Sequence, residues 1–99
     1  MGILKLEEIE RIVRELLREY GAEHAILFGS YARCEANADS DIDLIIFGGE
    51  DFIPKRVLEL AEDLRERTSK NADVFEIREV DERTAFYQNV LREGIRISA

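Results

Sequence analysis

The sequence predicts an α/β protein, α+β in its arrangement, with a mixed sheet of three to four strands covered by helices. Stretches with apolar residues at helical spacing alternate along the chain with short apolar runs that end in turn-forming residues. The chain has 99 residues, of which 45% are hydrophobic, and neither a repeat nor a Pro/Gly/Ser-rich linker divides it. Residues 1–99 are therefore expected to form a single domain with one core.

The first expected element is an amphipathic helix over residues 6–20. Its apolar residues recur at helical spacing, with Glu and Arg between them, and Gly21 stands where a helix commonly ends in a left-handed residue. The apolar positions that define this helix are Leu6, Ile9, Val13, Leu16, Leu17 and Tyr20.

Two buried strands are expected next, in "HAILFG" and "DIDLIIF". Between them, "SYARCEA" is long enough for only one or two helical turns, with Ser30 at their start. A connection of about a dozen residues is short for a parallel crossover. The turn "GGED" follows the second strand.

The second half of the chain predicts two helices and two strands. A long helix is expected from Pro54 to about Lys70, then a strand in "ADVFEI", a last helix, and a short edge strand in "IRIS". Asp81 is expected to cap the last helix and Gly94 to end it. Because a full helix joins the second and third strands, these two are expected to be parallel.

Composition excludes several classes of function. The net charge of −8 argues against direct DNA binding, because phosphate backbones need a basic surface. No apolar stretch is long enough to cross a membrane, and the N-terminus lacks the layout of a signal peptide. The single cysteine, Cys34, excludes an internal disulfide and is typical of the reducing cytoplasm.

Two aspartates, Asp41 and Asp43, lead directly into the second strand. Alternate residues of a strand face the same side, so these carboxylates are expected to point together and to repel each other unless a cation is bound. Asp73 begins the third strand in an equivalent place and would bring a third acid to the same edge. Three carboxylates can hold the two metal ions of a phosphoryl transfer.

Gly29 ends the first strand and Ser30 starts the short helical segment, with ten residues between Ser30 and Asp41. Glycine allows a phosphate to approach the backbone, and the following turn offers free N–H groups. Arg33 lies one turn further on, where it could contact a phosphate oxygen or form a surface ion pair.

Together, Gly29-Ser30 and Asp41-Ile42-Asp43 resemble the signature of the polymerase-beta-like nucleotidyltransferase superfamily. "GSYARCEANADSDIDLII" is most similar to its minimal, MNT-type members, including Ser40 before the first aspartate. One departure is Cys34, where the family usually has glycine. If that position has a positive φ, cysteine would strain the turn, with a shifted phosphate loop and lower activity as the expected consequence.

The resemblance implies transfer of AMP from ATP to a hydroxyl, with two Mg²⁺ ions. It implies that Asp41 and Asp43 bind metal, and that Asp73 is the third acid, which aligns or deprotonates the acceptor. Gly29 and Ser30 would hold the β- and γ-phosphates, with Arg33 and Ser40 as further candidates for nucleotide binding. Minimal members are often antitoxins of HEPN ribonuclease toxins, and some modify a tyrosine of the toxin. The short chain leaves no room for an acceptor domain, so a partner protein is expected to supply the acceptor.

Simpler interpretations stay open for each residue and for the function. An Asp-x-Asp pair can merely face water, Ser30 can cap a turn, and Ser40 can brace one. The chain could be a binding antitoxin without activity, or one subunit of a transferase that modifies a small molecule or an RNA end. The nucleotide, the acceptor and the oligomeric state are not determined by the sequence.

Overall fold

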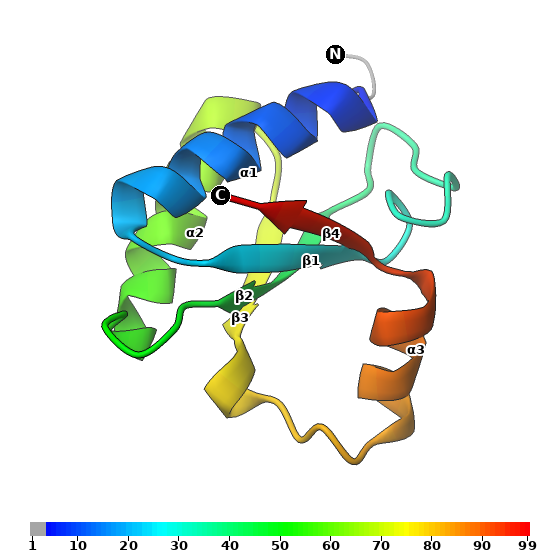
Figure 1. The fold of residues 1–99 in the computed structure, drawn as a ribbon. Coiled ribbons are helices and arrows are strands. Elements are labelled where there is room, and N and C mark those ends of the chain that lie inside the picture. Colours follow the sequence, from blue (N-terminus) through cyan, green and yellow to red (C-terminus); the bar gives the residue numbers. More distant parts are fainter. Residues whose placement is uncertain (1–3) are drawn as a thin grey trace.

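The computed structural model describes residues 4–99, which form three α-helices, four strands and two short 3₁₀ turns (Figure 1). This arrangement confirms the predicted fold class. In chain order the elements are α1 (Leu6–Tyr20), β1 (His24–Phe28), β2 (Ile42–Phe47), η1 (Pro54–Arg56), α2 (Val57–Thr68), β3 (Ala72–Glu76), η2 (Ile77–Glu79), α3 (Ala85–Glu93) and β4 (Ile95–Ser98).

The four strands form one mixed sheet in the order β3-β2-β1-β4. Strand β1 is antiparallel to both β2 and β4, whereas β2 and β3 are parallel. The connection types follow the lengths of the connecting segments. The short link between β1 and β2 favours an antiparallel pair, and helix α2 provides the crossover between β2 and β3. The expected edge strand "IRIS" is β4.

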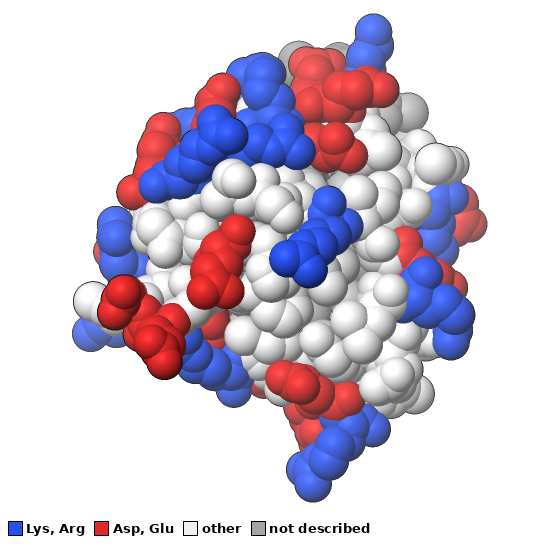
Figure 2. Space-filling view, viewed as in Figure 1, with Lys and Arg blue, Asp and Glu red and all other residues white. Residues whose placement is uncertain are grey.

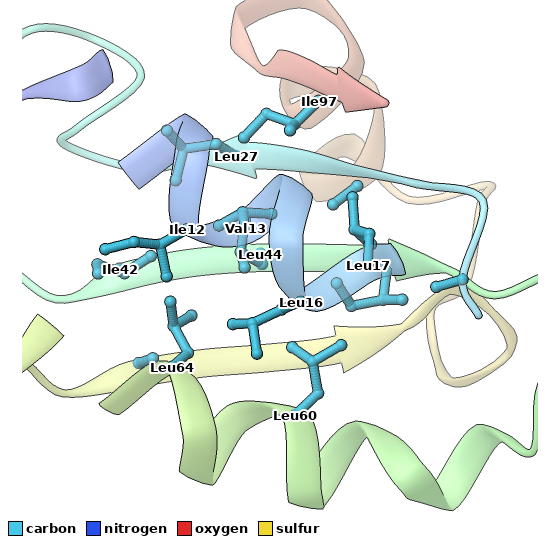
Figure 3. Close-up of a cluster of buried hydrophobic side chains, with 14 of the residues drawn as sticks. Ile12, Val13, Leu16, Leu17, Leu27, Ile42, Leu44, Leu60, Leu64 and Ile97 are labelled. Atoms are coloured by element: carbon cyan, nitrogen blue, oxygen red, sulfur yellow. The ribbon is translucent and has the colours of Figure 1, made fainter. Parts of the chain in front are cut away.

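Helices α1 and α2 cover one face of the sheet, where most of the core lies (Figures 1 and 3). Because side chains alternate along a strand, one set of strand residues packs against these helices. The fully buried members of this core include Ile9, Leu16, Leu17, Leu27, Ile42, Leu44, Ile46, Leu60, Leu64 and Ile97.

The opposite face of the sheet is covered mainly by α3, with Ile77 of η2 and Val80 packed against the same cluster. Tyr87 and Val90 of α3 pack on Ile26 and Ile45 of the two central strands. Toward β3 the same face is less covered, and Phe75 is 39% exposed. The two faces of the sheet therefore differ, and only one is fully closed by helices.

Most predicted boundaries are confirmed. Helix α1 spans the predicted residues, and Gly21 ends it with a φ of 71°. Helix α2 is preceded by the 3₁₀ turn η1 within the predicted range. Gly94 follows the last residue of α3, as expected.

Two local predictions were wrong. Residues 30–34 form a single turn rather than a helix. The N-cap of α3 is Thr84, not Asp81, because the Thr84 hydroxyl accepts a hydrogen bond from the Tyr87 N–H at 3.2 Å. The Asp81 carboxylate instead accepts from the backbone and side chain of Arg83.

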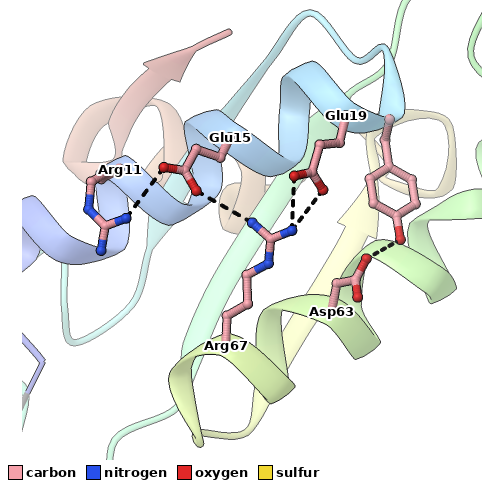
Figure 4. A network of polar contacts seen from close by, with 6 residues as sticks. Arg11, Glu15, Glu19, Asp63 and Arg67 are labelled. Carbon is pink, nitrogen blue, oxygen red and sulfur yellow. Dashed lines mark hydrogen bonds and ion pairs between the residues drawn. The ribbon is translucent and has the colours of Figure 1, made fainter.

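A polar network joins α1 to α2 outside the core (Figure 4). The guanidinium of Arg67 pairs with Glu19 at 2.7 Å and with Glu15 at 3.5 Å. Tyr20 donates its hydroxyl to the carboxylate of Asp63, which raises the pKa of Tyr20 to about 12. Exposed pairs such as those of Arg67 contribute at most about 1 kcal/mol each. The network orients the two helices, while the apolar core supplies most of the stability.

The surface carries both signs of charge, with acidic and basic side chains intermixed over the helices (Figure 2). Among residues 4–99, none of the helices has the length and apolar character needed to cross a bilayer.

Candidate active site

The register of the sheet brings three of the predicted residues to one end of the molecule. Phe28, the last residue of β1, pairs with Asp43 of β2, and Asp43 pairs with Asp73 of β3. Gly29 follows Phe28 directly and therefore lies beside Asp43. Asp43 shares its face of the sheet with Ile45, which packs under α3. The site therefore lies on the less covered face.

Asp43 has the most perturbed carboxyl group of the site. Burial, together with the negative charges of Asp73 and Asp41, raises the pKa of Asp43 to about 6, whereas Arg33 opposes the shift. Asp43 and Asp73 are also close enough to share a hydrogen bond when one of them is protonated. This is the behaviour expected of carboxylates gathered at one site without a cation.

Asp41 lies differently from the other two acids. It is exposed and precedes β2 by one residue, so the alternation of the strand does not determine where its side chain points. It lines a polar cavity of about 370 Å³ together with Ser40, Lys70 and Asn71. Within residues 4–99, no three carboxylates form a ready-made set of metal ligands. The expected convergence of the acids thus holds for Asp43 and Asp73, while Asp41 acts on Asp43 only through its charge.

Gly29 is required by geometry. Its φ is 76°, a conformation that favours glycine, and a β-carbon at this position would overlap the carboxylate of Asp43. The absence of a side chain therefore allows the end of β1 to lie directly against the carboxylate. A phosphate group could approach the backbone here in the same way.

The turn after Gly29 is closed by three backbone hydrogen bonds. The Arg33 N–H donates to the Gly29 carbonyl at 3.2 Å, and the Glu35 N–H donates to the Ser30 carbonyl at 2.9 Å. The Cys34 N–H donates to the Tyr31 carbonyl at 3.4 Å, which completes the pattern that ends many helices with a left-handed residue.

The left-handed residue of this turn is Cys34, with a φ of 58°. The condition under which a cysteine strains this turn, a positive φ, is therefore met. The turn nevertheless keeps all three closing hydrogen bonds. Within the described part of the chain, the N–H groups of Ser30, Tyr31 and Ala32 donate to no other group, so they remain free for an anion.

The remaining predicted residues have structural partners. Arg33 pairs with Glu35 at 2.7 Å and lies 4.0 Å from Glu93 of α3. The Ser40 hydroxyl accepts a hydrogen bond from the Asn37 N–H at 2.8 Å, and so it braces the loop before Asp41. These contacts match the simpler of the two interpretations given to each residue.

The sequence did not single out the residues that α3 contributes. A cavity of about 300 Å³ lies beside Gly29 and Arg33, and Phe86, Asn89 and Glu93 of α3 line its other side. The ring of Phe86 packs edge-on against Phe28, with centroids 5.5 Å apart. The one signal for this role is the 48% exposure of Phe86, and only the structure reveals it.

Comparison with known proteins agrees with this geometry. The profile of the polymerase beta nucleotidyltransferase family matches residues 10–99. The chain belongs to this family. The resemblance read from Gly29, Ser30, Asp41 and Asp43 is thereby confirmed, and the protein is a nucleotidyltransferase.

Two relatives of this nucleotidyltransferase bear names that specify an activity. A protein of Methanocaldococcus jannaschii named as a protein adenylyltransferase is 35% identical over 71 residues, which cover 72% of this chain and 76% of the relative. The protein adenylyltransferase MntA of Thermococcus cleftensis is 44% identical over 50 residues, or 46% of this chain and half of the relative.

Solved structures share the nucleotidyltransferase fold. A minimal nucleotidyltransferase superposes with a TM-score of 0.73 at 30% identity, covering 90% of this chain and 88% of that one. A toxin–antitoxin complex with AMP-PNP gives a TM-score of 0.75 at 24% identity, covering 89% of this chain and 71% of that one. The MNT antitoxin in complex with a tri-AMPylated HEPN toxin of Shewanella oneidensis gives a TM-score of 0.69 at 22% identity, covering 92% of this chain and 70% of that one. Because the last two structures are less than 25% identical to this chain, their likeness shows the fold alone.

Proposed function

We propose that this nucleotidyltransferase moves AMP from ATP to a tyrosine hydroxyl of a HEPN-type partner protein and thereby acts as its antitoxin. The observation that carries the proposal is the juxtaposition of Gly29, Asp43 and Asp73 at one end of the sheet. It places a backbone segment open to phosphate next to two carboxyl groups, one of which, that of Asp43, has a raised pKa.

The reaction follows from this arrangement. The acceptor oxygen attacks the α-phosphorus of ATP, a new O–P bond forms, and the bond from the α-phosphorus to the bridging oxygen of pyrophosphate breaks. Asp73 aligns the acceptor hydroxyl and takes its proton. The free N–H groups after Gly29 and the Ser30 hydroxyl hold the β- and γ-phosphates. Pyrophosphate leaves with the electron pair of the broken bond.

The donor set fits Mg²⁺. Asp41, Asp43 and Asp73 offer only carboxylate oxygens, the ligands that hard divalent cations prefer. The raised pKa of Asp43 supports the proposal, because Arg33 does not offset the burial and the neighbouring negative charges, whereas a bound cation would. Asp41 and Asp43 would hold the metal ions, after Asp41 turns from the solvent toward Asp43. Bound Mg²⁺ would polarise the α-phosphate and neutralise the charge that develops on the leaving pyrophosphate.

The acceptor and the cellular setting rest on different support. The relatives named as protein adenylyltransferases, and the AMPylated toxin bound to the Shewanella antitoxin, favour a protein acceptor. We further propose that residues 1–99 make one transferase domain and that the partner supplies most of the acceptor site. A single unpaired cysteine suits a cytoplasmic location.

The decisive experiment measures transfer of label from α-³²P-ATP, with Mg²⁺, to the protein that co-purifies with this chain. The Asp41→Ala/Asp43→Ala variant tests the metal ligands. Asp51→Ala is the matched control, because Asp51 is an exposed aspartate outside the site. The expected result is label on a tyrosine of the partner with the wild type and the control, and at least a hundredfold less with the double variant.

The other outcomes are equally informative. A complex that stays tight in all three forms without any label would identify a binding antitoxin and would overturn the transferase proposal. Label that persists in the Asp41→Ala/Asp43→Ala variant would exclude the carboxylates as metal ligands. Label on a small molecule or on an RNA end would replace the protein acceptor.

A further inference from the structure

The uncovered part of the sheet face forms a groove beside the site. Between β3 and the beginning of α3 lies a cavity of about 260 Å³, lined by Phe75, Glu79, Val80, Asp81, Thr84 and Phe86. Phe75 is 39% exposed and Phe86 is 48% exposed, so two aromatic rings border open space. We call this cavity the β3–α3 groove.

The groove is continuous with the site through β3. Phe75 follows Asp73 by two residues, and both point to the same face of the sheet at a separation of about 7 Å along the strand. An extended polypeptide has the same repeat. If an acceptor hydroxyl lies at Asp73, the side chain two residues away in the acceptor segment therefore reaches Phe75.

Phe86 separates this groove from the cavity beside Gly29. Its ring lines both cavities and packs against Phe28. The cavity on the Gly29 side lies next to the phosphate turn, and the β3–α3 groove lies next to Asp73. The two sides of Phe86 thus correspond to the two substrates of a transfer, with the nucleotide on one side and the acceptor on the other.

The charge of the groove restricts the occupant. Its lining includes Glu79 and Asp81 and no basic side chain among the described residues. Arg83 offsets Asp81 through an ion pair at 3.1 Å, which leaves Glu79 to make the groove negative. A nucleic acid strand or a second copy of this chain, whose net charge is −8, would be repelled.

We propose that the β3–α3 groove binds the segment of the partner protein that carries the acceptor hydroxyl. An apolar side chain two residues from that hydroxyl packs between Phe75 and Phe86, and a basic residue next to it faces Glu79. The proposal rests on the proposed function, because it assigns the groove to the acceptor of that transfer.

The test uses a fluorescein-labelled synthetic peptide, Gly-Lys-Phe-Gly-Tyr-Gly-Phe-Lys-Gly, whose symmetric order serves either direction of binding. Its affinity is measured by fluorescence anisotropy for the wild type and for the Phe75→Ser and Phe86→Ser variants. Leu91→Ser is the matched control, because Leu91 is 49% exposed and lies on α3 but lines neither of the cavities beside Phe86. Circular dichroism verifies that each variant is folded.

The expected result is binding at least fivefold weaker in the Phe75 and Phe86 variants and unchanged within twofold in the Leu91 control. Replacing both lysines of the peptide by glutamate should weaken binding to the wild type to a similar extent. The proposal is overturned if the wild type does not bind the peptide, if all variants bind equally, or if a labelled single-stranded RNA binds more tightly.

Transfer of AMP to the peptide tyrosine is measured in parallel, and it separates this inference from the proposed function. Binding that depends on Phe75, without transfer by the wild type, supports the groove and contradicts the transferase activity. Transfer that is equally fast in the Phe75→Ser variant supports the activity and overturns the groove.

Discussion

At the scale of single residues, two positions in or beside the site are energetically unfavourable. Cys34 has a left-handed backbone in the turn after Gly29, where a β-carbon is unfavourable. Asp43 has a raised pKa because it is partly buried beside two other acids. Both features oppose stability, and both lie where nucleotide and metal are proposed to bind. Backbone strain and charge repulsion commonly occur together at functional sites.

Replacing Cys34 with glycine should stabilise the protein by about 1 kcal/mol, because glycine adopts a positive φ without steric cost. The measurement is the free energy of unfolding in urea. Cys34→Ala is the control, since it removes the thiol and keeps the β-carbon, and it should leave stability within about 0.5 kcal/mol of the wild type. Equal stabilities for the Gly and Ala variants would show that the turn is not strained.

The raised pKa of Asp43 predicts a pH dependence of stability in the absence of metal. The folded protein holds a proton on Asp43 up to about pH 6, whereas the unfolded chain releases it near 3.8. The stabilisation that the folded protein gains from holding this proton is fully present below pH 3.8 and is lost as the pH rises through about 6.

In EDTA at pH 7, Asp43→Asn should therefore be more stable than the wild type by about 1 kcal/mol, a value reduced for partial exposure to solvent. The difference should shrink as the pH falls toward 4. Urea unfolding at several pH values measures it. A difference that does not depend on pH would exclude the titration of Asp43 as its cause.

At the scale of elements, the junction between β3 and η2 holds the end of β2 in place. Glu76 is completely buried, and its carboxylate accepts hydrogen bonds from the Arg78 N–H at 2.8 Å and the Gly48 N–H at 3.4 Å. The guanidinium of Arg78 donates to the carbonyls of Gly49 and Phe52. This pair of residues therefore ties the loop after β2 to the end of β3, away from the site.

Glu76→Ala should destabilise the protein by about 2–4 kcal/mol, because it leaves two N–H groups without their acceptor and removes a charge partner of Arg78. Thermal unfolding or urea titration measures the loss. Glu66→Ala, on the exposed side of α2, is the control and should change stability by less than about 0.5 kcal/mol. A loss no larger than the control's would mean that the buried carboxylate contributes nothing.

At the scale of the whole molecule, a net charge of −8 and a cluster of acids at one end of the sheet favour cation binding. Binding to the folded state alone raises stability by mass action. At a Mg²⁺ concentration ten times its Kd, the gain is about 1.4 kcal/mol. In a domain of this size that corresponds to a rise in Tm of about 6–10 °C.

This rise should be absent from the Asp41→Asn/Asp43→Asn variant and from the wild type in KCl of equal ionic strength. Differential scanning fluorimetry measures all three. If KCl raises the Tm as much as MgCl₂ does, general screening of the acidic charge explains the effect, and the proposed metal site is wrong.

The sequence predicted the sheet and the helices, and it singled out the residues of the candidate site, because each left a local pattern. The spacing of Gly29, Ser30, Asp41 and Asp43 identified the family. Asp73 was expected beside Asp43 because each stands at the beginning of a strand and the two strands were expected to be parallel neighbours. The cap at Thr84 was missed because Asp81 has an equally suitable side chain, and only the path of the loop decides between them.

The sequence by itself determined the elements, the family and the presence of acids next to the Gly29-Ser30 turn, since these depend on neighbours along the chain. The tertiary structure decided that Asp41 points to solvent, that α3 leaves part of its sheet face open, and that Phe75 and Phe86 border one groove. The reason is physical. These features depend on strand register and on how one helix packs across a sheet, and such contacts join residues far apart in the sequence.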